Sequence, residues 1–200
     1  NYLLQINAIK LNTKNPFTWA SGIKSPIYCD NRLILSNIEV RGYIADQMSD
    51  IIRKSFSDNY ILAGVATGAI AIGALVAERL KKPYIYVRPT PKGHGLKNQI
   101  EGSLPVRSDV VVIEDLISTG MSSLNAVEAI KSVDSNVKGM LSIFSYSFDF
   151  AIEKFKSEKI DLISLADYNI LVEIAKEEKI INSDEIKKLE RWREDPENWM

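Results

Sequence analysis

Glu114 and Asp115 stand side by side directly after the apolar run VVVI at residues 110–113. A run that is apolar on both faces is typical of a central strand in a parallel sheet, and open α/β sheets bind ligands at the carboxyl ends of such strands. Behind the acids, the sequence STGMSS (residues 118–123) leads into a segment of helical period. Hydroxyl groups, backbone amides and the positive N-terminal end of a helix together favour a phosphate monoester. The stretch therefore offers two carboxylates beside an anion cradle, which suits the hydroxyls and the phosphate of a ribose 5-phosphate unit.

The same residues also have simpler interpretations. An acid pair at the end of a strand can be a solvated face or a helix N-cap, and Ser-Thr-Gly before a helix is commonly a cap. The order of the features as a whole favours a ligand site, although it contains neither the G-x-x-x-x-G-K-[ST] nor the G-x-G-x-x-G pattern. Adjacent strand residues point to opposite faces. Glu114 and Asp115 can therefore reach one diol only if the strand ends or twists there, and we expect that it does.

The elements that must position these residues follow an alternating pattern from about Tyr60 onward. Short β-branched or apolar runs predict strands at residues 60–65, 84–88, 109–114, 137–144 and 161–164. Longer segments of helical period predict helices at residues 69–80, 122–133, 149–157, 168–178 and 183–194. Such alternation indicates an α/β fold with a central parallel sheet flanked by helices.

Two further regions do not follow this pattern. Residues 38–52 have helical period, and the irregular stretch before them, residues 15–32, carries apolar side chains that need burial, which indicates an elaboration of the sheet domain. Residues 89–107 contain three prolines and three glycines without clear periodicity. A loop of this length in a compact domain is usually a functional lid or disordered.

Composition excludes several classes of protein. Two hundred residues, 46% hydrophobic and 26% charged, suit one domain with one core. Lys plus Arg (25) nearly balance Asp plus Glu (26), so we expect neither a nucleic-acid nor a membrane partner. The single cysteine, Cys29, allows no internal disulfide, and we find neither an apolar stretch of about 18 residues nor the basic flank of a signal peptide. These features favour the cytoplasm.

The strand, acid pair and phosphate loop resemble the signature of the type I phosphoribosyltransferases. Within them, residues 17–32, 87–102 and 114–123 are similar to the orotate phosphoribosyltransferases, as is the ending WREDPENW at 192–199. The resemblance runs from about Asn15 to the end of the chain. It implies the type I phosphoribosyltransferase fold as a single domain over residues 1–200. Its parts would be an N-terminal hood (about 1–55), a core sheet (about 56–165) with a long mobile lid loop (about 89–107), and C-terminal helices (about 166–200).

The resemblance also implies an activity. Enzymes of this family transfer the 5-phosphoribosyl group from 5-phosphoribosyl 1-pyrophosphate (PRPP) to orotate. The products are orotidine 5′-monophosphate and pyrophosphate, in the de novo synthesis of pyrimidine nucleotides. The cofactor would be Mg²⁺, held mainly by PRPP and not directly by the protein. The family is homodimeric, and the lid of one subunit reaches into the site of its neighbour.

Residue roles carried over from the family fall into three groups. Lys92, His94, Arg88 and Asp115 would be catalytic, the first three from the lid. The PRPP-binding residues would include these four together with Glu114, Leu116, Ile117, Ser118, Thr119, Gly120, Met121 and Ser122. Ser118, Tyr28, Cys29 and Lys24 would bind orotate, and residues 66–69 would form the loop facing pyrophosphate. For Tyr28, and for Trp19 nearby, core packing remains the alternative to stacking on the base.

The chain departs from the family pattern at four places. Pro89 follows Arg88 where some members have a second cation, and Gly68 stands where some have lysine. Residues 145–147 read Ser-Tyr-Ser where others have arginine, and Met121 replaces a smaller residue. Lys97 could compensate on the lid. The alternatives are a phosphoribosyltransferase that uses a purine base, and a PRPP-sensing regulator, which would be expected to carry an added DNA-binding region.

Overall fold

A six-stranded sheet forms the centre of the protein in a computed structural model that describes residues 1–19, 22–91, 98–196 and 198–199. Its order is β10 (Leu162–Asp167), β9 (Asn136–Ser145), β8 (Asp109–Ile117), β5 (Ile61–Val65), β6 (Tyr84–Val87) and β7 (Ile100–Glu101). The first five run parallel, and β7 pairs with β6 in the antiparallel sense. The predicted α/β fold with a central parallel sheet is confirmed.

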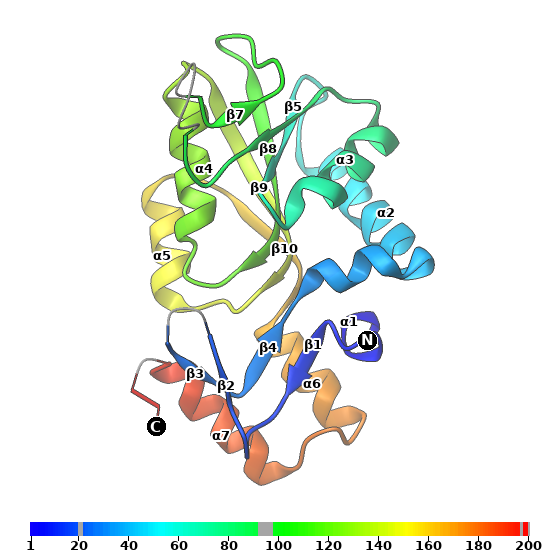
Figure 1. Cartoon of the computed structure of the whole chain (residues 1–200), viewed down its shortest axis with the longest axis vertical. Helices are drawn as coiled ribbons and strands as arrows, with labels where there is room; N and C mark the ends of the chain where they lie inside the picture. Colours follow the sequence, from blue (N-terminus) through cyan, green and yellow to red (C-terminus); the bar gives the residue numbers. More distant parts are fainter. Residues whose placement is uncertain (20–21, 92–97, 197, 200) are drawn as a thin grey trace.

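Helices cover both faces of this sheet (Figure 1). On β8, Val111 and Ile113 pack into the cluster that includes α2 (Ile38–Ser55) and α3 (Ala69–Leu80). Val110 and Val112 pack on the opposite face, with α4 (Met121–Lys131) and α5 (Asp149–Ser157). Successive side chains of a strand point to opposite faces, so a strand buried on both sides is apolar throughout. This explains the uninterrupted VVVI run before the acids.

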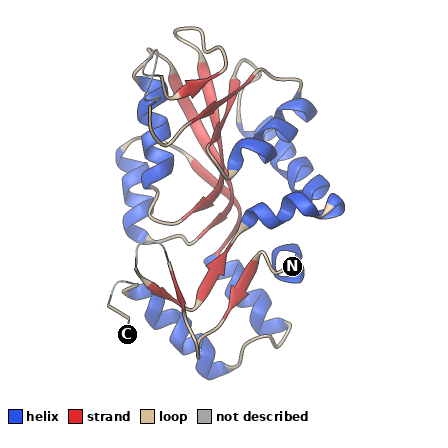
Figure 2. Ribbon diagram, in the orientation of Figure 1, coloured by secondary structure: helices blue, strands red, loops and turns tan. Residues whose placement is uncertain are grey.

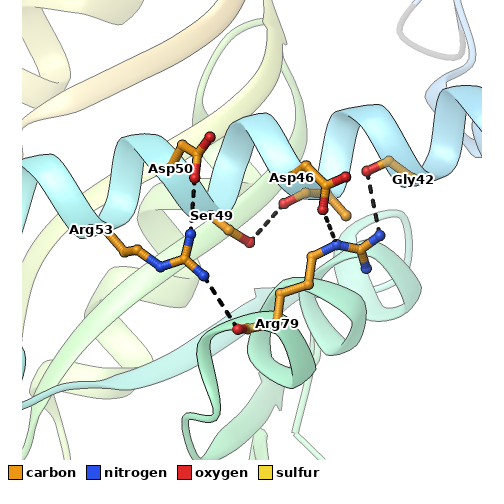
Figure 3. A network of polar contacts seen from close by, with 7 residues as sticks. Gly42, Asp46, Ser49, Asp50, Arg53 and Arg79 are labelled. Atoms are coloured by element: carbon orange, nitrogen blue, oxygen red, sulfur yellow. Dashed lines mark hydrogen bonds and ion pairs between the residues drawn. The ribbon is translucent and has the colours of Figure 1, made fainter.

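Polar contacts hold α2 along α3 (Figure 3). The Arg79 guanidinium of α3 donates through Nε to Asp46 Oδ1 at 2.5 Å and through Nη2 to the carbonyl oxygen of Gly42 at 3.4 Å. In return, Arg53 Nη2 of α2 donates to the carbonyl oxygen of Arg79 at 3.4 Å. Charged side chains thus link α2 and α3 at their exposed side, whereas the sides that face the core are apolar.

A smaller layer of short strands lies beside the C-terminal helices, apart from the main sheet (Figure 2). In this hood, β1 (Ile9–Leu11) pairs with β4 (Ile27–Cys29), and β2 (Phe17–Thr18) pairs with β3 (Lys24–Ser25). The other elements of this layer and its surroundings are α1 (Tyr2–Gln5), η1 (Asn31–Ser36), α6 (Tyr168–Glu177) and α7 (Ser183–Glu194). Trp192 of α7 is fully buried and donates through Nε1 to the carbonyl oxygen of Lys24 at 3.1 Å. The C-terminal helix therefore holds the N-terminal hood in place.

Several predicted boundaries differ from the observed ones, and two of these differences bear on the site. The strand predicted at residues 109–114 continues through Ile117, because Leu116 and Ile117 keep their pairing with β9. The loop expected over residues 89–107 is interrupted by β7, since Ile100 is only 5% exposed and pairs with Val87. Lys92, His94 and Lys97 lie outside the described residues. None of the described helices has the length and hydrophobicity needed to cross a bilayer.

Candidate active site

The topology of the sheet creates a cavity where β5 and β8 lie side by side. After β5 the chain adds β6 on one side, and then returns to place β8 on the other side of β5. Loops that leave two such strands diverge, so a crevice opens at their carboxyl ends. A cavity of about 410 Å³ occupies this position. Its lining consists of residues 29–32 from the hood, residues 65–68 after β5, residues 114–116 of β8, and Ser122.

Glu114 is buried at the wall of this cavity, with 4% of its surface exposed. Its Oε1 accepts the backbone N–H of Asp115 at 3.0 Å, and its Oε2 accepts the Ser123 hydroxyl at 2.8 Å. Burial raises the pKa of Glu114 well above its ordinary value, and the negative charge of Asp115 adds to the effect. Glu114 thus ties β8 to the first turn of α4, and both of its oxygens have protein partners.

Asp115 lies against the loop that follows β5. A Cβ atom added to Gly68 would lie 2.1 Å from Asp115 Oδ2, so the carboxylate occupies the space that any side chain at position 68 would need. Gly68 is the N-cap of α3, and the positive end of a helix stabilises a nearby carboxylate. Although β8 continues past the acids, Glu114 and Asp115 both line the one cavity.

The turn between β8 and α4 has the features of an anion cradle. Gly120 is the N-cap of α4 with φ of +76°, and no described side chain caps the helix there. The capping interpretation of the Ser-Thr-Gly sequence is therefore wrong, and the amides of the first turn stay available. Met121 is 63% exposed, so its side chain points to solvent and does not fill the cradle. Ser122 lines the cavity.

On the hood side, the residues expected to bind the base are only partly brought together. Cys29 lines the cavity, and its thiol donates to Asn31 Oδ1 at 3.4 Å. Tyr28 is 38% exposed, with its ring 5.5 Å from that of Phe17, but it does not line this cavity. Lys24 is exposed on β3 and donates to the Thr18 hydroxyl at 2.7 Å. Ser118 is half-buried in the turn before α4 and is not among the residues that line the cavity.

Trp19 belongs to an aromatic cluster beneath the hood. Its ring centroid lies 5.0 Å from that of Tyr146 and 5.8 Å from that of Trp192. Its Nε1 donates to the carbonyl oxygen of Ile27 at 3.2 Å. Of the two interpretations, core packing is the one that this geometry supports for Trp19.

Arg88 stands at the base of the loop expected to be the lid. Its backbone N–H donates to the carbonyl oxygen of Gln99 at 2.8 Å, and its Nη1 lies 3.4 Å from Glu101 Oε1. The side chain is directed along the β6–β7 pair and is not among the residues that line the cavity. The other two expected lid residues, Lys92 and His94, fall in the part of the chain that is not described.

Four residues of the site were not singled out from the sequence. Asp30, Asn31 and Arg32 line the cavity, and Ser123 holds Glu114. The first three lie in an irregular segment, where no periodicity indicates which side chain faces which element. For Ser123 there was a signal, because a buried serine in the first turn of a helix after an acid pair can donate to one of the acids.

The fold and the site define a class. A parallel sheet with a cavity at its switch point, an acid pair at the end of a central strand and an uncapped turn before the next helix are the features of a type I phosphoribosyltransferase.

Comparison with known proteins gives the family. The chain is 52% identical over 197 residues to an orotate phosphoribosyltransferase of Phocaeicola vulgatus, covering 98% of this chain and 93% of that protein. It is 48% identical to the enzyme of the same name from Bacillus pumilus, covering 100% of this chain and 95% of that protein. The crystal structure of orotate phosphoribosyltransferase from Aeropyrum pernix superposes with a TM-score of 0.77 at 28% identity, covering 90% of this chain and 98% of that one. No family model matches the sequence. The chain belongs to the orotate phosphoribosyltransferase family.

Proposed function

We propose that the reaction of this family, transfer of the 5-phosphoribosyl group from PRPP to orotate, takes place in the cavity at the ends of β5 and β8. One observation carries the proposal: Asp115 and the uncapped first turn of α4 border the same cavity, and Glu114 ties them together. This arrangement suits a ribose whose hydroxyls meet Asp115 while its phosphate meets the turn. The product is orotidine 5′-monophosphate, in the de novo synthesis of pyrimidine nucleotides.

Asp115 provides the electrostatic part of catalysis. As the bond from ribose C1 to pyrophosphate lengthens, the sugar gains oxocarbenium character and hence positive charge. A fixed carboxylate beside the ribose hydroxyls stabilises this charge more in the transition state than in the ground state. Glu114 is buried, and both of its carboxylate oxygens accept hydrogen bonds. These bonds fix the Asp115 backbone relative to the first turn of α4.

The turn before α4 binds the 5-phosphate. Its donors are the backbone amides of residues 118–122 and the hydroxyls of Ser118, Thr119 and Ser122. The positive end of the helix adds a favourable field. Because Gly120 has a left-handed φ and packs against Phe155, a larger residue there would displace the turn.

The residues of the cavity fit a metal ion that arrives with the substrate. Mg²⁺ prefers oxygen ligands and is commonly bound through substrate phosphates together with one or two carboxylates. Asp30 is paired with Arg32 and Glu114 with Ser123, and no group of three potential metal ligands occurs among the described residues. The ion would be held mainly by PRPP and would supply positive charge beside the pyrophosphate group.

Orotate would lie on the hood side, where Cys29 lines the cavity. Tyr28, Lys24 and Ser118 do not line the cavity and would have to approach the base when it binds. The lid supplies Arg88, Lys92 and His94, and its closure excludes water, which would otherwise hydrolyse the activated ribose. The lid acts in the site of a second subunit, so the working enzyme is a homodimer. The near-zero net charge and the single cysteine support a location in the cytoplasm.

The test is an assay of the purified protein with PRPP, Mg²⁺ and orotate, followed by the loss of the ultraviolet absorbance of orotate. Hypoxanthine, guanine and uracil serve as control bases. Asp115→Asn should lower kcat about 100-fold, the usual scale for losing one electrostatic contact to the transition state. The matched control is Asp109→Asn, which changes an acid at the opposite end of the same strand. Turnover of a purine alone, or equal effects of the two substitutions, would reject the proposal.

A further inference from the structure

Arg32 lines the cavity from the hood side. Among the described residues that line it, Arg32 alone carries a cationic side chain, whereas Asp30, Glu114 and Asp115 are acidic. A cavity that receives PRPP must hold a diphosphate with several negative charges close to these carboxylates. A cation in the wall lowers that repulsion, in addition to the metal ion that accompanies the substrate.

Asp30 fixes the direction of the Arg32 guanidinium. Its Oδ1 accepts Nε at 2.6 Å and its Oδ2 accepts Nη2 at 2.9 Å, while Oδ1 also accepts the backbone N–H of Arg32 at 3.2 Å. The hydrogen bonds with Arg32 lower the pKa of Asp30, and those with Asp30 raise the pKa of Arg32. The charge of Asp115 adds weakly to the second shift, so the cation lies within electrostatic range of the acid pair.

One edge of the guanidinium remains available. The Arg32 side chain is 63% exposed, and its Nη1 has no hydrogen-bond partner among the residues that the structure describes. A planar guanidinium held by a carboxylate on one edge presents its other edge for paired hydrogen bonds to phosphate oxygens. The ion pair with Asp30 therefore orients the Arg32 guanidinium and leaves Nη1 available to donate to a ligand.

The backbone around Arg32 is also fixed relative to the site. Its neighbour Asn31 is buried and donates through Nδ2 to the carbonyl oxygen of Asp115 at 2.6 Å. Residues 66–68 and the N-terminus of α3 form another wall of the same cavity. A guanidinium and a helix N-terminus around one space both favour an anion.

We propose that Arg32 is a substrate-binding residue that contacts the diphosphate of PRPP from the hood side. This inference rests on the proposed function, because it takes the ribose of PRPP to lie at Asp115. In the transfer, the bond from ribose C1 to a diphosphate oxygen breaks and its electron pair leaves with the diphosphate. C1 forms a bond to N1 of orotate, whose N–H bond breaks as its proton passes to the departing diphosphate. Arg32 stabilises the charge that the diphosphate gains.

Steady-state kinetics and calorimetry of Arg32→Met test the assignment. The KM for PRPP and the Kd for inorganic pyrophosphate should rise about 10-fold to 100-fold, the range for losing charge-assisted hydrogen bonds. The KM for orotate and the Kd for orotidine 5′-monophosphate, which has no diphosphate, should stay near the wild-type values. Arg32→Lys should restore part of the affinity. The control is Arg53→Met, an exposed arginine of α2 paired with Asp50 outside the cavity.

The outcomes separate this inference from the proposed function. Wild-type affinity for PRPP and pyrophosphate in Arg32→Met would overturn the assignment and leave the proposed function intact. An equal loss of affinity for PRPP and orotidine 5′-monophosphate would also overturn it, because Arg32 would then support the whole site. A wild-type protein that binds neither compound would reject the proposed function itself.

Discussion

The side-chain amide of Asn31 donates a 2.6 Å hydrogen bond to the main-chain carbonyl oxygen of Asp115. The two residues are 84 positions apart, and Asn31 is 3% exposed. This bond joins the hood to the end of β8, next to the acid that meets the ribose. The position of the hood and the direction of the Asp115 backbone are therefore coupled.

Asn31→Ala should lower both stability and turnover. The substitution leaves a buried carbonyl oxygen without its donor, which costs about 1–3 kcal/mol in the free energy of unfolding. It also frees the Asp115 backbone, so kcat should fall about 10-fold, as expected when a reacting group loses its fixed geometry. Urea denaturation and the orotate assay measure the two effects. Asn136→Ala, at the exposed start of β9, is the control, and full kcat in Asn31→Ala would mean that the bond is only structural.

Gly68→Ala should reduce activity more than stability. The new Cβ atom would lie 2.1 Å from Asp115 Oδ2, so the carboxylate must move away from the position that it holds beside the cavity. We expect kcat to fall about 100-fold, comparable to losing one electrostatic contact with the transition state.

The control for Gly68→Ala is Gly42→Ala on α2. A Cβ atom there would meet only Arg79 Nη2 at 3.9 Å, and alanine favours a helix by about 1 kcal/mol over glycine. This variant should be fully active and slightly more stable. Wild-type turnover in Gly68→Ala would mean that catalysis does not depend on the present position of the Asp115 carboxylate.

Glu114→Gln should change how stability depends on pH. The pKa of Glu114 is raised in the folded protein, chiefly by burial, so the folded state holds its proton to higher pH than the unfolded state. Protonated Glu114 contributes its full share to the free energy of unfolding below the pKa that it has in the unfolded state, about 4.3. This contribution is lost as the pH rises through the pKa that it has in the folded state. Glutamine cannot ionise and avoids this loss.

Urea denaturation between about pH 5 and about pH 8 measures the effect, since that range lies above the unfolded pKa. The free energy of unfolding should fall with pH more steeply in the wild type than in Glu114→Gln. Glu128→Gln, an exposed acid of α4, should behave as the wild type. Parallel curves for Glu114→Gln and the wild type would contradict a raised pKa at this site.

A mixture of two inactive variants should regain activity if the lid acts across a dimer interface. Lys92→Ala removes a lid residue, and Asp115→Asn removes the ribose contact. In a hybrid dimer, one site combines an intact Asp115 with the intact lid of the other subunit. Random exchange of subunits makes about half of the dimers hybrids, and one of the two sites works in each hybrid. The mixture should therefore show about a quarter of wild-type activity. Each variant refolded alone is the control, and no recovery after exchange would assign the lid to its own subunit.

Much of the sheet domain follows from the sequence, because its signals are local. The helices at residues 69–80, 149–157 and 183–194 have the predicted bounds, since the period of an amphipathic helix is contained within a few turns. The acids at the end of β8 and the turn before α4 are contiguous in the chain, so their proximity needed no knowledge of the fold. The end of β8 was misjudged because an acid pair was taken as a stop, whereas pairing with β9 decides where the strand ends.

The tertiary structure alone decided how the hood meets this site. Strands of two or three residues, such as β2, β3 and β4, are too short to carry a periodic signal. The bond from Asn31 to Asp115, the contact of Gly68 with the Asp115 carboxylate and the bond from Trp192 to Lys24 join segments far apart in the chain. Such contacts depend on strand order and on the packing of whole elements, and no local pattern of residues encodes them.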